Sequence, residues 1–324
     1  MAHEIDSTTG KAGMAYKGAA PWHNLGQRLD ADATMDDWKT AAGLDWKCQR
    51  APVYFDYNDS GEQKPFTGKD VLFRSDTHAP LAVVSSGYHI AQPAQVLDFF
   101  AAIAKNKNFE METAGSLFEG RRIWALARVG ENARILDDVV APYLMLATSY
   151  DATMSTIAQF TSVRVVCNNT LQGSLRNGSG KGRVTVPHSA IFRPEEISAE
   201  LGLATTSWDQ FITKATRMAV RKISDTEMDK YLLALLDPED VAAPEKTQKS
   251  KGYKRIMALF HGEQMGTGQD AVDGTVWGAL QATTQYIDWE VGRNLDNRLD
   301  AAWFGTGARV KTQAALILDH IASA

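Results

Sequence analysis

Apolar and polar residues alternate along much of the first half of the chain, as they do in strands that bury one face. β-branched and aromatic residues form short runs, and glycine, asparagine and aspartate separate them. Because alternation predicts strands and short turns join antiparallel neighbours, we predict a hairpin-rich sheet. The expected strands are 51–55, 71–74, 81–84, 109–116, 122–129, 143–149 and 155–166.

Two helices are expected within this first half. Residues 34–42 begin with Thr34, a residue type that caps helices, and acidic residues follow in the first turn. The second helix begins at Pro93, where a first-turn residue needs no amide donor. Its apolar residues recur on one face, at Val96, Leu97, Phe100 and Ile103.

The hydrophobic period becomes helical after Pro187. A long helical segment is expected from Arg193 towards Arg221, and Ser224 with Glu227 forms a capping box for the next helix. Residues 242–252 form a polar linker that carries lysines. Further helices are predicted at 254–261, around Trp277, Tyr286 and Trp289, and after Lys311.

This order of elements predicts the α+β class. We expect an antiparallel sheet with covering helices and an N-terminal arm over residues 1–190, and a mainly helical region over 191–324. The chain has no internal repeat. It also lacks the strand-helix alternation of a doubly wound dinucleotide-binding fold.

Composition narrows the classes of protein further. The 324 residues carry a formal net charge of −5, which argues against a tail-driven polyanion binder but allows a local basic groove. The only cysteines, Cys48 and Cys167, suit a reducing compartment. The N-terminus lacks a signal sequence, and no run approaches the roughly 18 apolar residues of a membrane span. We therefore expect a soluble cytoplasmic protein with no membrane partner.

The most informative segment is 160–175, in which a β-branched run passes through Cys167 into polar residues. Arg164, Asn168, Asn169 and Thr170 stand where we expect the strand to change into a turn or helix. Such side chains present hydrogen-bond donors. They either bind a polyanion or lock the backbone of their own domain.

A basic, glycine-rich loop follows at 176–183. It is not a phosphate-binding P-loop, because Gly182 replaces the hydroxyl residue that would hold magnesium. Arg176, Lys181 and Arg183 either attract phosphates electrostatically or are merely solvated.

Aromatic and basic residues also lie together along the preceding strands. Tyr150, Phe160 and Arg128 join Arg164 in a pattern that single-strand binding proteins use, with arginines on the backbone and aromatics against bases. The alternative is that the aromatic residues pack in the core and the arginines are solvated.

No catalytic signature is present. The seven histidines lack the paired spacing of a zinc site, and no neighbouring base activates Cys167. We predict no catalytic residue, no metal and no cofactor, and therefore a protein that is not an enzyme.

Four segments together resemble a phage- and plasmid-related family of unknown function, number nine hundred and thirty-two. They are residues 21–26, 85–92, 164–171 and 303–305. The resemblance implies a mobile-element origin, in the cytoplasm of a bacterial host, and no assigned chemistry. The layout also loosely resembles the β-β-β-α core of annealing recombinases of the RecT, Redβ and Rad type, without a shared motif.

These observations predict a homo-oligomeric, ATP-independent protein of phage or plasmid recombination that binds and anneals single-stranded DNA. Arg164, Asn168, Asn169 and Thr170 would contact the strand. Arg176, Lys181 and Arg183 would steer phosphates. Arg128 and Tyr150 complete the predicted nucleic-acid-binding residues. The alternative is a mobile-element interaction protein that modulates a host factor, with a host protein as its partner.

Overall fold

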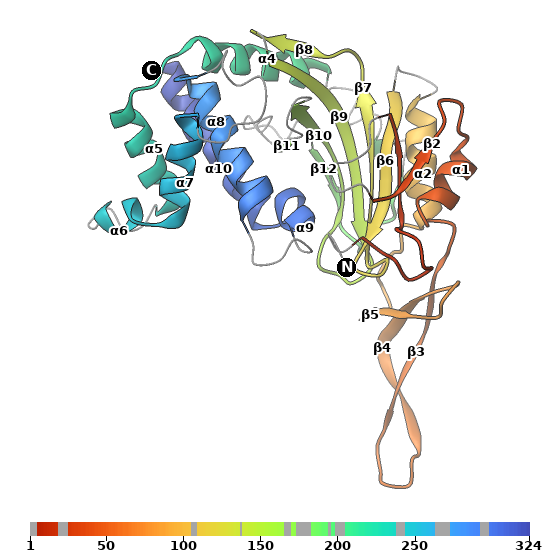
Figure 1. Cartoon of the computed structure of the whole chain (residues 1–324). Coiled ribbons are helices and arrows are strands. Elements are labelled where there is room, and N and C mark those ends of the chain that lie inside the picture. The colour runs from red at the N-terminus through yellow and green to blue at the C-terminus, as the bar shows by residue number, and fades with distance from the viewer. Residues whose placement is uncertain are drawn as a thin grey trace. The chain divides into compact units, whose positions relative to one another are not determined.

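The protein has mixed strands and helices, so the predicted α+β class is confirmed (Figure 1). The computed structural model describes residues 5–18, 25–104, 109–136, 138–164, 170–172, 183–193, 196–197, 205–237, 244–262, 273–291 and 298–324. Contacts divide the chain into two compact units. Unit 1 comprises Met1–Val129, Leu144–Gln159 and Arg183–Gly202, and unit 2 comprises Gly130–Tyr143, Phe160–Gly182 and Leu203–Ala324. Neither unit is continuous, whereas the sequence predicted one boundary near residue 190.

Nine strands of the described chain form one large sheet in the order β11-β10-β9-β7-β6-β1-β2, with β12 paired to β10 and β8 to β9. Strands β9 and β10 each contribute residues to both units. The β1–β6, β6–β7, β8–β9, β10–β11 and β10–β12 pairs are antiparallel, and β1 and β2 pair in parallel. The strands are β1 Met14–Lys17, β2 Gln27–Leu29, β6 Phe109–Leu117, β7 Arg122–Val129, β8 Ala133–Ile135, β9 Asp138–Ser149, β10 Thr156–Arg164, β11 Thr170–Gln172 and β12 Arg183–Val186.

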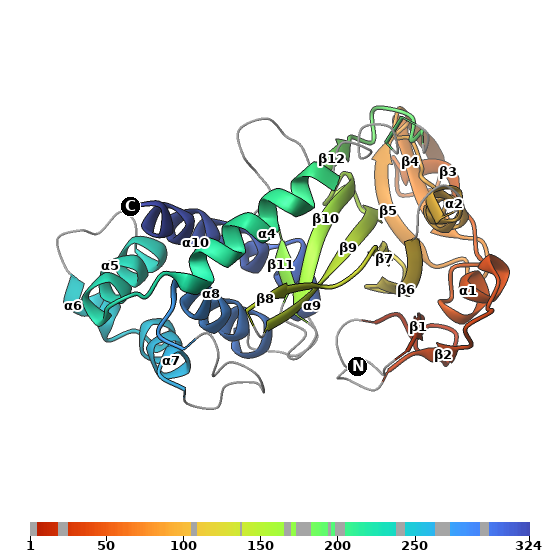
Figure 2. The ribbon, with the colours of Figure 1, turned by 90° about the horizontal axis from the view of Figure 1, so that it is seen from above.

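The predicted β6–β7 hairpin is confirmed and lies in the core of unit 1. Its two strands pair from Phe109 with Val129 to Leu117 with Arg122. The turn places Phe118 and Glu119 at positive φ before Gly120. Helix α2 (Pro93–Ala104) packs against both strands (Figure 2). Apolar side chains of helix and hairpin therefore bury one another.

A second, three-stranded sheet in unit 1 has the order β3-β4-β5. It is built from Cys48–Asp56, Gln63–Arg74 and Pro80–Ser85. Strand β4 begins eight residues before the predicted position 71, because 63–69 are exposed and lack the alternation that marks a half-buried strand. Beyond β5, β3 and β4 continue alone as a two-stranded hairpin (Figure 1).

A buried arginine anchors the root of this hairpin. Arg74 is fully buried, and its guanidinium forms ion pairs with Asp6 at 2.5 Å and Asp76 at 2.7 Å. It also donates to the carbonyl of Glu119 at 3.2 Å and lies over the ring of Trp46. Buried charge is tolerated when it is paired and hydrogen-bonded, as it is here. Four separate segments of unit 1 therefore converge on one side chain.

Helices dominate unit 2, and α4, α8 and α10 pack side by side around a core that includes Trp277 and Leu318 (Figure 2). The Ser224–Glu227 capping box is confirmed at α5, as is the Thr34 cap of α1 (Met35–Ala41) in unit 1. The described helices of unit 2 are α4 Thr205–Val220, α5 Asp225–Leu236, α6 Pro244–Gln248, α7 Lys251–Phe260, α8 Val276–Gln285, the π-helix η4 Tyr286–Glu290, α9 Arg298–Trp303 and α10 Thr306–Ser323.

Two predictions about these helices were wrong. The expected linker 242–252 contains α6 and the start of α7, because Pro244 can begin a helix and Ser250 caps the next one. The terminal helix begins at Thr306, five residues before Lys311. No helix among the described residues is long and apolar enough to cross a bilayer.

Candidate nucleic-acid interface

The segment that the sequence singled out contains a β-ribbon in unit 2. Strand β10 ends at Arg164, and β11 runs antiparallel beside it. Thr161 pairs with Gln172 and Val163 pairs with Thr170. The expectation of a turn or helix at Thr170 was wrong, because backbone pairing with β10 continues through 170–172.

This pairing brings two of the predicted contact residues together. Arg164 directly follows Val163, which pairs with Thr170, so the backbones of Arg164 and Thr170 lie on neighbouring strands at the same end of the ribbon. Asn168 and Asn169 fall in the segment that joins these strands, outside the described residues. Arg176 and Lys181 also lie outside the described residues.

One residue at the ribbon has an unusual environment. Ser162 is 4% exposed, and its hydroxyl has no hydrogen-bond partner among the residues that the structure describes. Its register partner is Leu171 of β11. Buried hydroxyls nearly always have a partner, so a free one is typical of a place that accommodates a further polar group.

Tyr150 does not fit the predicted role. It is 0% exposed, its hydroxyl donates to the carbonyl of Ala91 at 2.7 Å, and its ring packs edge-on against Trp46. Burial raises the pKa of this phenol well above its usual value. Tyr150 is therefore a core residue of unit 1, and we remove it from the candidate interface. Phe160, in unit 2, is also buried, so we remove it from the candidate interface as well.

The two remaining arginines lie on strands in unit 1. Arg128 is half-buried on β7, opposite Glu110 of β6. Arg183 is exposed at the start of β12, opposite Gln159 of β10. The exposure of Arg183 suits a contact with phosphate, whereas the partial burial of Arg128 suits a structural role.

A second group of cations in unit 2 was noted in the sequence as part of a linker but was not assigned to a site. Four exposed lysines fall within nine residues, on α6, on α7 and between these helices. Within the described chain, Glu245 lies 4.0 Å from Lys249 and is the only ion-pair partner of the group. The lysines are Lys246, Lys249, Lys251 and Lys254. A local cluster of one sign attracts polyanions even in an acidic protein. The four lysines recur at short spacing in the sequence, and this spacing is the signal that could have identified the group.

The motif 85–92 is a structural junction of unit 1. The hydroxyl of Tyr88 donates to the carbonyl of Ser149 at 2.7 Å, which fits a buried core tyrosine. Gln92 accepts from the Cys48 amide at 2.9 Å and donates to its carbonyl at 3.0 Å, as a paired strand would. Burial raises the pKa of the Cys48 thiol to about 12, so this cysteine is not a reactive nucleophile.

His188, two residues after β12, packs against the same junction. Its ring stacks on Tyr88 with centroids 4.2 Å apart. Nδ1 lies 3.1 Å from the carbonyl of His89, and Nε2 lies 3.0 Å from the carbonyl of Met154. Both ring nitrogens therefore lie within hydrogen-bond distance of backbone carbonyls of unit 1, and whichever nitrogen carries the proton donates to one of them, so the histidine is structural.

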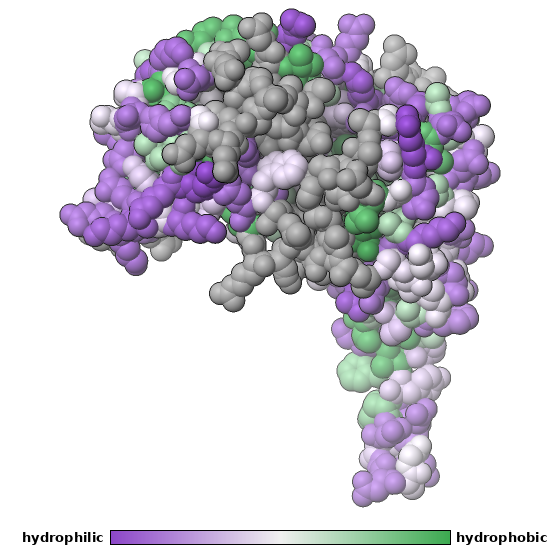
Figure 3. Space-filling model, in the orientation of Figure 1, coloured by the Kyte–Doolittle hydropathy of each residue, from purple (hydrophilic) through white to green (hydrophobic). Residues whose placement is uncertain are grey.

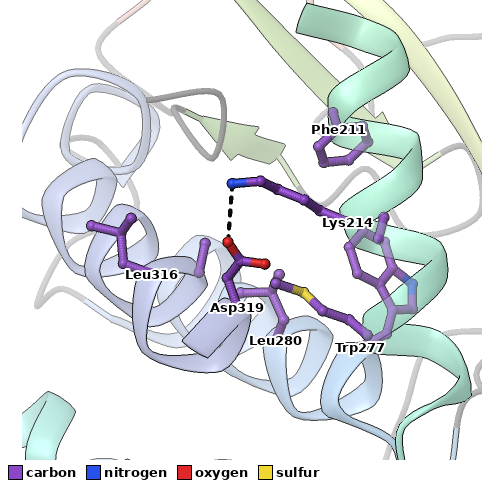
Figure 4. A pocket seen from close by; sticks show the side chains of 9 residues that line it. Phe211, Lys214, Trp277, Leu280, Leu316 and Asp319 are labelled. Atoms are coloured by element: carbon purple, nitrogen blue, oxygen red, sulfur yellow. Dashed lines mark ion pairs between the residues drawn. The ribbon is translucent and has the colours of Figure 1, made fainter. Parts of the chain in front are cut away.

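Unit 2 also has a surface pocket between α4, α8 and α10. Its lining includes the apolar side chains of Phe211, Trp277 and Leu280. Lys214 and Asp319 form an ion pair at 3.0 Å across it (Figure 4). The lining offers apolar contact and one ion pair, and no nucleophile beside a base. Among the described residues, no group of histidine, cysteine, aspartate or glutamate side chains is arranged to hold a metal ion.

Comparison with families of known proteins gives a match over most of the chain. The model of a family described as a domain of unknown function, DUF932, matches residues 80–303. No curated protein and no solved structure matches the chain.

Proposed function

The chain belongs to the DUF932 family, and from this premise we propose that it is a single-stranded DNA-binding and annealing protein of phage or plasmid recombination. The function needs no ATP and no covalent chemistry. It requires a surface that holds the sugar-phosphate backbone while the bases stay accessible to a complementary strand.

One observation carries this proposal. The β10–β11 ribbon places Arg164 and Thr170 at the same end of two paired strands, on either side of the segment with Asn168 and Asn169. Arginine donates to phosphate in a planar fork, and asparagine amides and threonine hydroxyls donate to phosphate or to base edges. Residues that the sequence suggested for one ligand therefore gather within one short ribbon of unit 2.

The lysines of α6 and α7 supply the charge that a polyanion requires. Lys246, Lys249, Lys251 and Lys254 are exposed and belong to the same unit as the ribbon. Phosphate contacts provide most of the sequence-independent affinity for nucleic acid, and they weaken as salt competes. We assign the lysines to capture of the strand and the ribbon residues to its local contacts.

Fluorescence anisotropy with a labelled thymidine homopolymer tests the proposal. We expect binding at about 50 mM salt that weakens steeply towards about 200 mM. Arg164→Ala should weaken binding about 10- to 150-fold, because a charged hydrogen bond contributes roughly 1.5–3 kcal/mol. Arg28→Ala is the matched control, since Arg28 is an exposed arginine on β2. Absence of binding at low salt would exclude the proposal.

The lysines are tested by the salt dependence of the same binding. Replacing Lys246 and Lys251 by alanine should reduce the slope of log affinity against log salt by about 0.7 for each lost phosphate contact. Lys11→Ala, at an exposed position of unit 1, should leave the slope unchanged. Annealing is measured separately, as the rate at which complementary strands form a duplex with and without protein. Binding without any acceleration would limit the function to strand binding.

A further inference from the structure

The most exposed apolar surface of unit 1 lies on the hairpin that β3 and β4 form beyond β5. We define this arm as residues 53–68. Every residue of the arm except Val53 is exposed. Phe55 is 46% exposed, Tyr57 45% and Phe66 50%. Figure 3 shows hydrophobic residues along the arm between its root and a hydrophilic tip.

The strand register places these three aromatics on one face. Phe55 pairs directly with Lys64, and directly opposed residues share a face. Residues two positions along share that face as well, which adds Phe66 on β4 and Tyr57, the residue after β3, whose amide still donates to the carbonyl of Glu62. Phe55 and Phe66 pack edge to face with ring centroids 6.3 Å apart. We call this surface the aromatic face of the arm.

The arm lacks the support that hairpins usually need. A two-stranded hairpin is at best marginally stable in water without packing on one face. In the described structure β3 is also an edge strand, since its only sheet neighbour is β4. Proteins usually protect such edges, and an exposed apolar edge favours association. We propose that the aromatic face is a homodimer contact, in which the arm of a second copy of this chain covers it.

Charge favours a protein partner over nucleic acid at this surface. The arm contains Asp56, Asp59, Glu62 and Lys64, which gives it two excess negative charges. A polyanion would be repelled. The aromatic face itself carries one charge of each sign, because Glu62 precedes β4 by one residue, lies two residues from Lys64 and accepts from the Tyr57 hydroxyl.

These two charges make the face complementary to itself. In a dimer whose twofold axis passes between Glu62 and Lys64, Lys64 of each copy faces Glu62 of the other copy. The contact then contains two equivalent ion pairs. In the single chain, Lys64 lies 3.8 Å from the centroid of the Tyr57 ring, and Glu62 binds Tyr57 and Asn58. Both charged groups therefore already lie beside the aromatic rings that the contact would bury.

The area suits a symmetric contact. Aromatic side chains of about 150–250 Å² that are half exposed leave roughly 200–350 Å² of apolar surface on one face. A second copy doubles this area, and with the polar surface the contact reaches about 700–1,200 Å², the range of weak and transient interfaces. A polar partner surface would contribute no comparable apolar area. We therefore expect a dimer that dissociates at micromolar concentration.

Sedimentation equilibrium over a concentration series tests the contact in the full chain without DNA. The wild type should dimerise, and Phe55→Ser with Phe66→Ser should weaken the dimer at least tenfold. Ile191→Ser with Val220→Ser is the matched control, because both residues are exposed apolar residues outside the arm, and it should dimerise as the wild type does. Circular dichroism checks that each variant folds.

A charge exchange distinguishes a second copy from any other partner. Glu62→Lys alone and Lys64→Glu alone should each weaken the homodimer, because like charges then face each other. Mixing the two variants should restore a heterodimer, in which both ion pairs are re-formed. A wild type that stays monomeric, a dimer unaffected by the serine variants, or variants that fail to pair with each other would overturn the proposal. Arm variants that lose single-stranded DNA binding but keep the wild-type dimer would also overturn it and assign the face to nucleic acid.

Discussion

Two hairpins of unit 1 share the same local geometry and differ in burial. The β6–β7 hairpin and the β3–β4 hairpin are both antiparallel and joined by tight turns. The first six residues of β7 are buried, whereas 63–69 of β4 are all exposed. Backbone pairing therefore does not determine whether a hairpin stabilises the fold or offers a surface to a partner. The buried hairpin stabilises the unit, and the exposed hairpin offers its side chains to a partner.

Truncating one aromatic residue in each hairpin should separate the two roles most strongly. Trp124 on β7 is 1% exposed, so Trp124→Ala should lower the free energy of unfolding by about 3–5 kcal/mol. Phe66→Ala in the arm should cost about 0.5 kcal/mol or less in the monomer. Urea unfolding at low protein concentration measures both. Equal losses would show that the arm packs as a core element.

The turn of the buried hairpin should tolerate less change than an open turn. Gly120 has φ +90°, and a Cβ there would lie 2.8 Å from an Arg74 guanidinium nitrogen. Gly120→Ala should cost about 1–3 kcal/mol, through backbone strain and displacement of Arg74. Gly130→Ala is the control for strain alone, since Gly130 has φ +75° and no atom within 4 Å of its Cβ position. Thermal unfolding that shifts equally in both variants would contradict a steric role for the Arg74 contact.

The Arg74 anchor predicts a smaller, pH-dependent effect at the root of the arm. Burial disfavours the charge of Asp6, but hydrogen bonds from Thr8 and Arg74 outweigh burial and lower the pKa of Asp6. A lowered carboxyl pKa stabilises the fold above the unfolded value of about 3.9, and this stabilisation is lost as pH falls through the lower native value. Asp6→Asn should therefore flatten the fall in stability on acidification.

Urea midpoints measured between about pH 3 and pH 7 check this expectation. Asp32→Asn, at an exposed turn, should keep the wild-type dependence. A wild-type slope in Asp6→Asn would show that other carboxyl groups cause the acid instability.

The sequence predicted elements well where local patterns suffice. The Thr34 and Ser224 caps were predicted correctly, because a capping box needs only residues within one turn. The β6–β7 hairpin was predicted for the same reason. The first strand of the arm was predicted up to residue 55, but the β4 side was missed because 63–69 are exposed and carry no alternation to recognise. Helix α6 and the first residues of α7 were missed because a polar composition with proline resembles a linker.

At the candidate site, too, the sequence predicted what depends on residue types and missed what depends on pairing and burial. A strand ending near Arg164, followed by polar residues, could be predicted from residue types. The pairing of β11 with β10 could not be predicted, because three residues of strand carry too little pattern. Tyr150 was assigned to the site because a tyrosine beside basic residues fits both a core and a binding surface. The burial of Tyr150 and its ring contact with Trp46 show that it is a core residue.

The sequence by itself therefore determined the α+β class, the caps and the residue types available to a ligand, since each depends on neighbours a few positions apart. Only the tertiary structure decided which side chains are exposed. Arg74 and Tyr150 became internal because distant segments close over them, and Phe55 and Phe66 stayed outside because none of the described segments does. Burial depends on contacts between residues far apart in the chain, and no local pattern encodes those contacts.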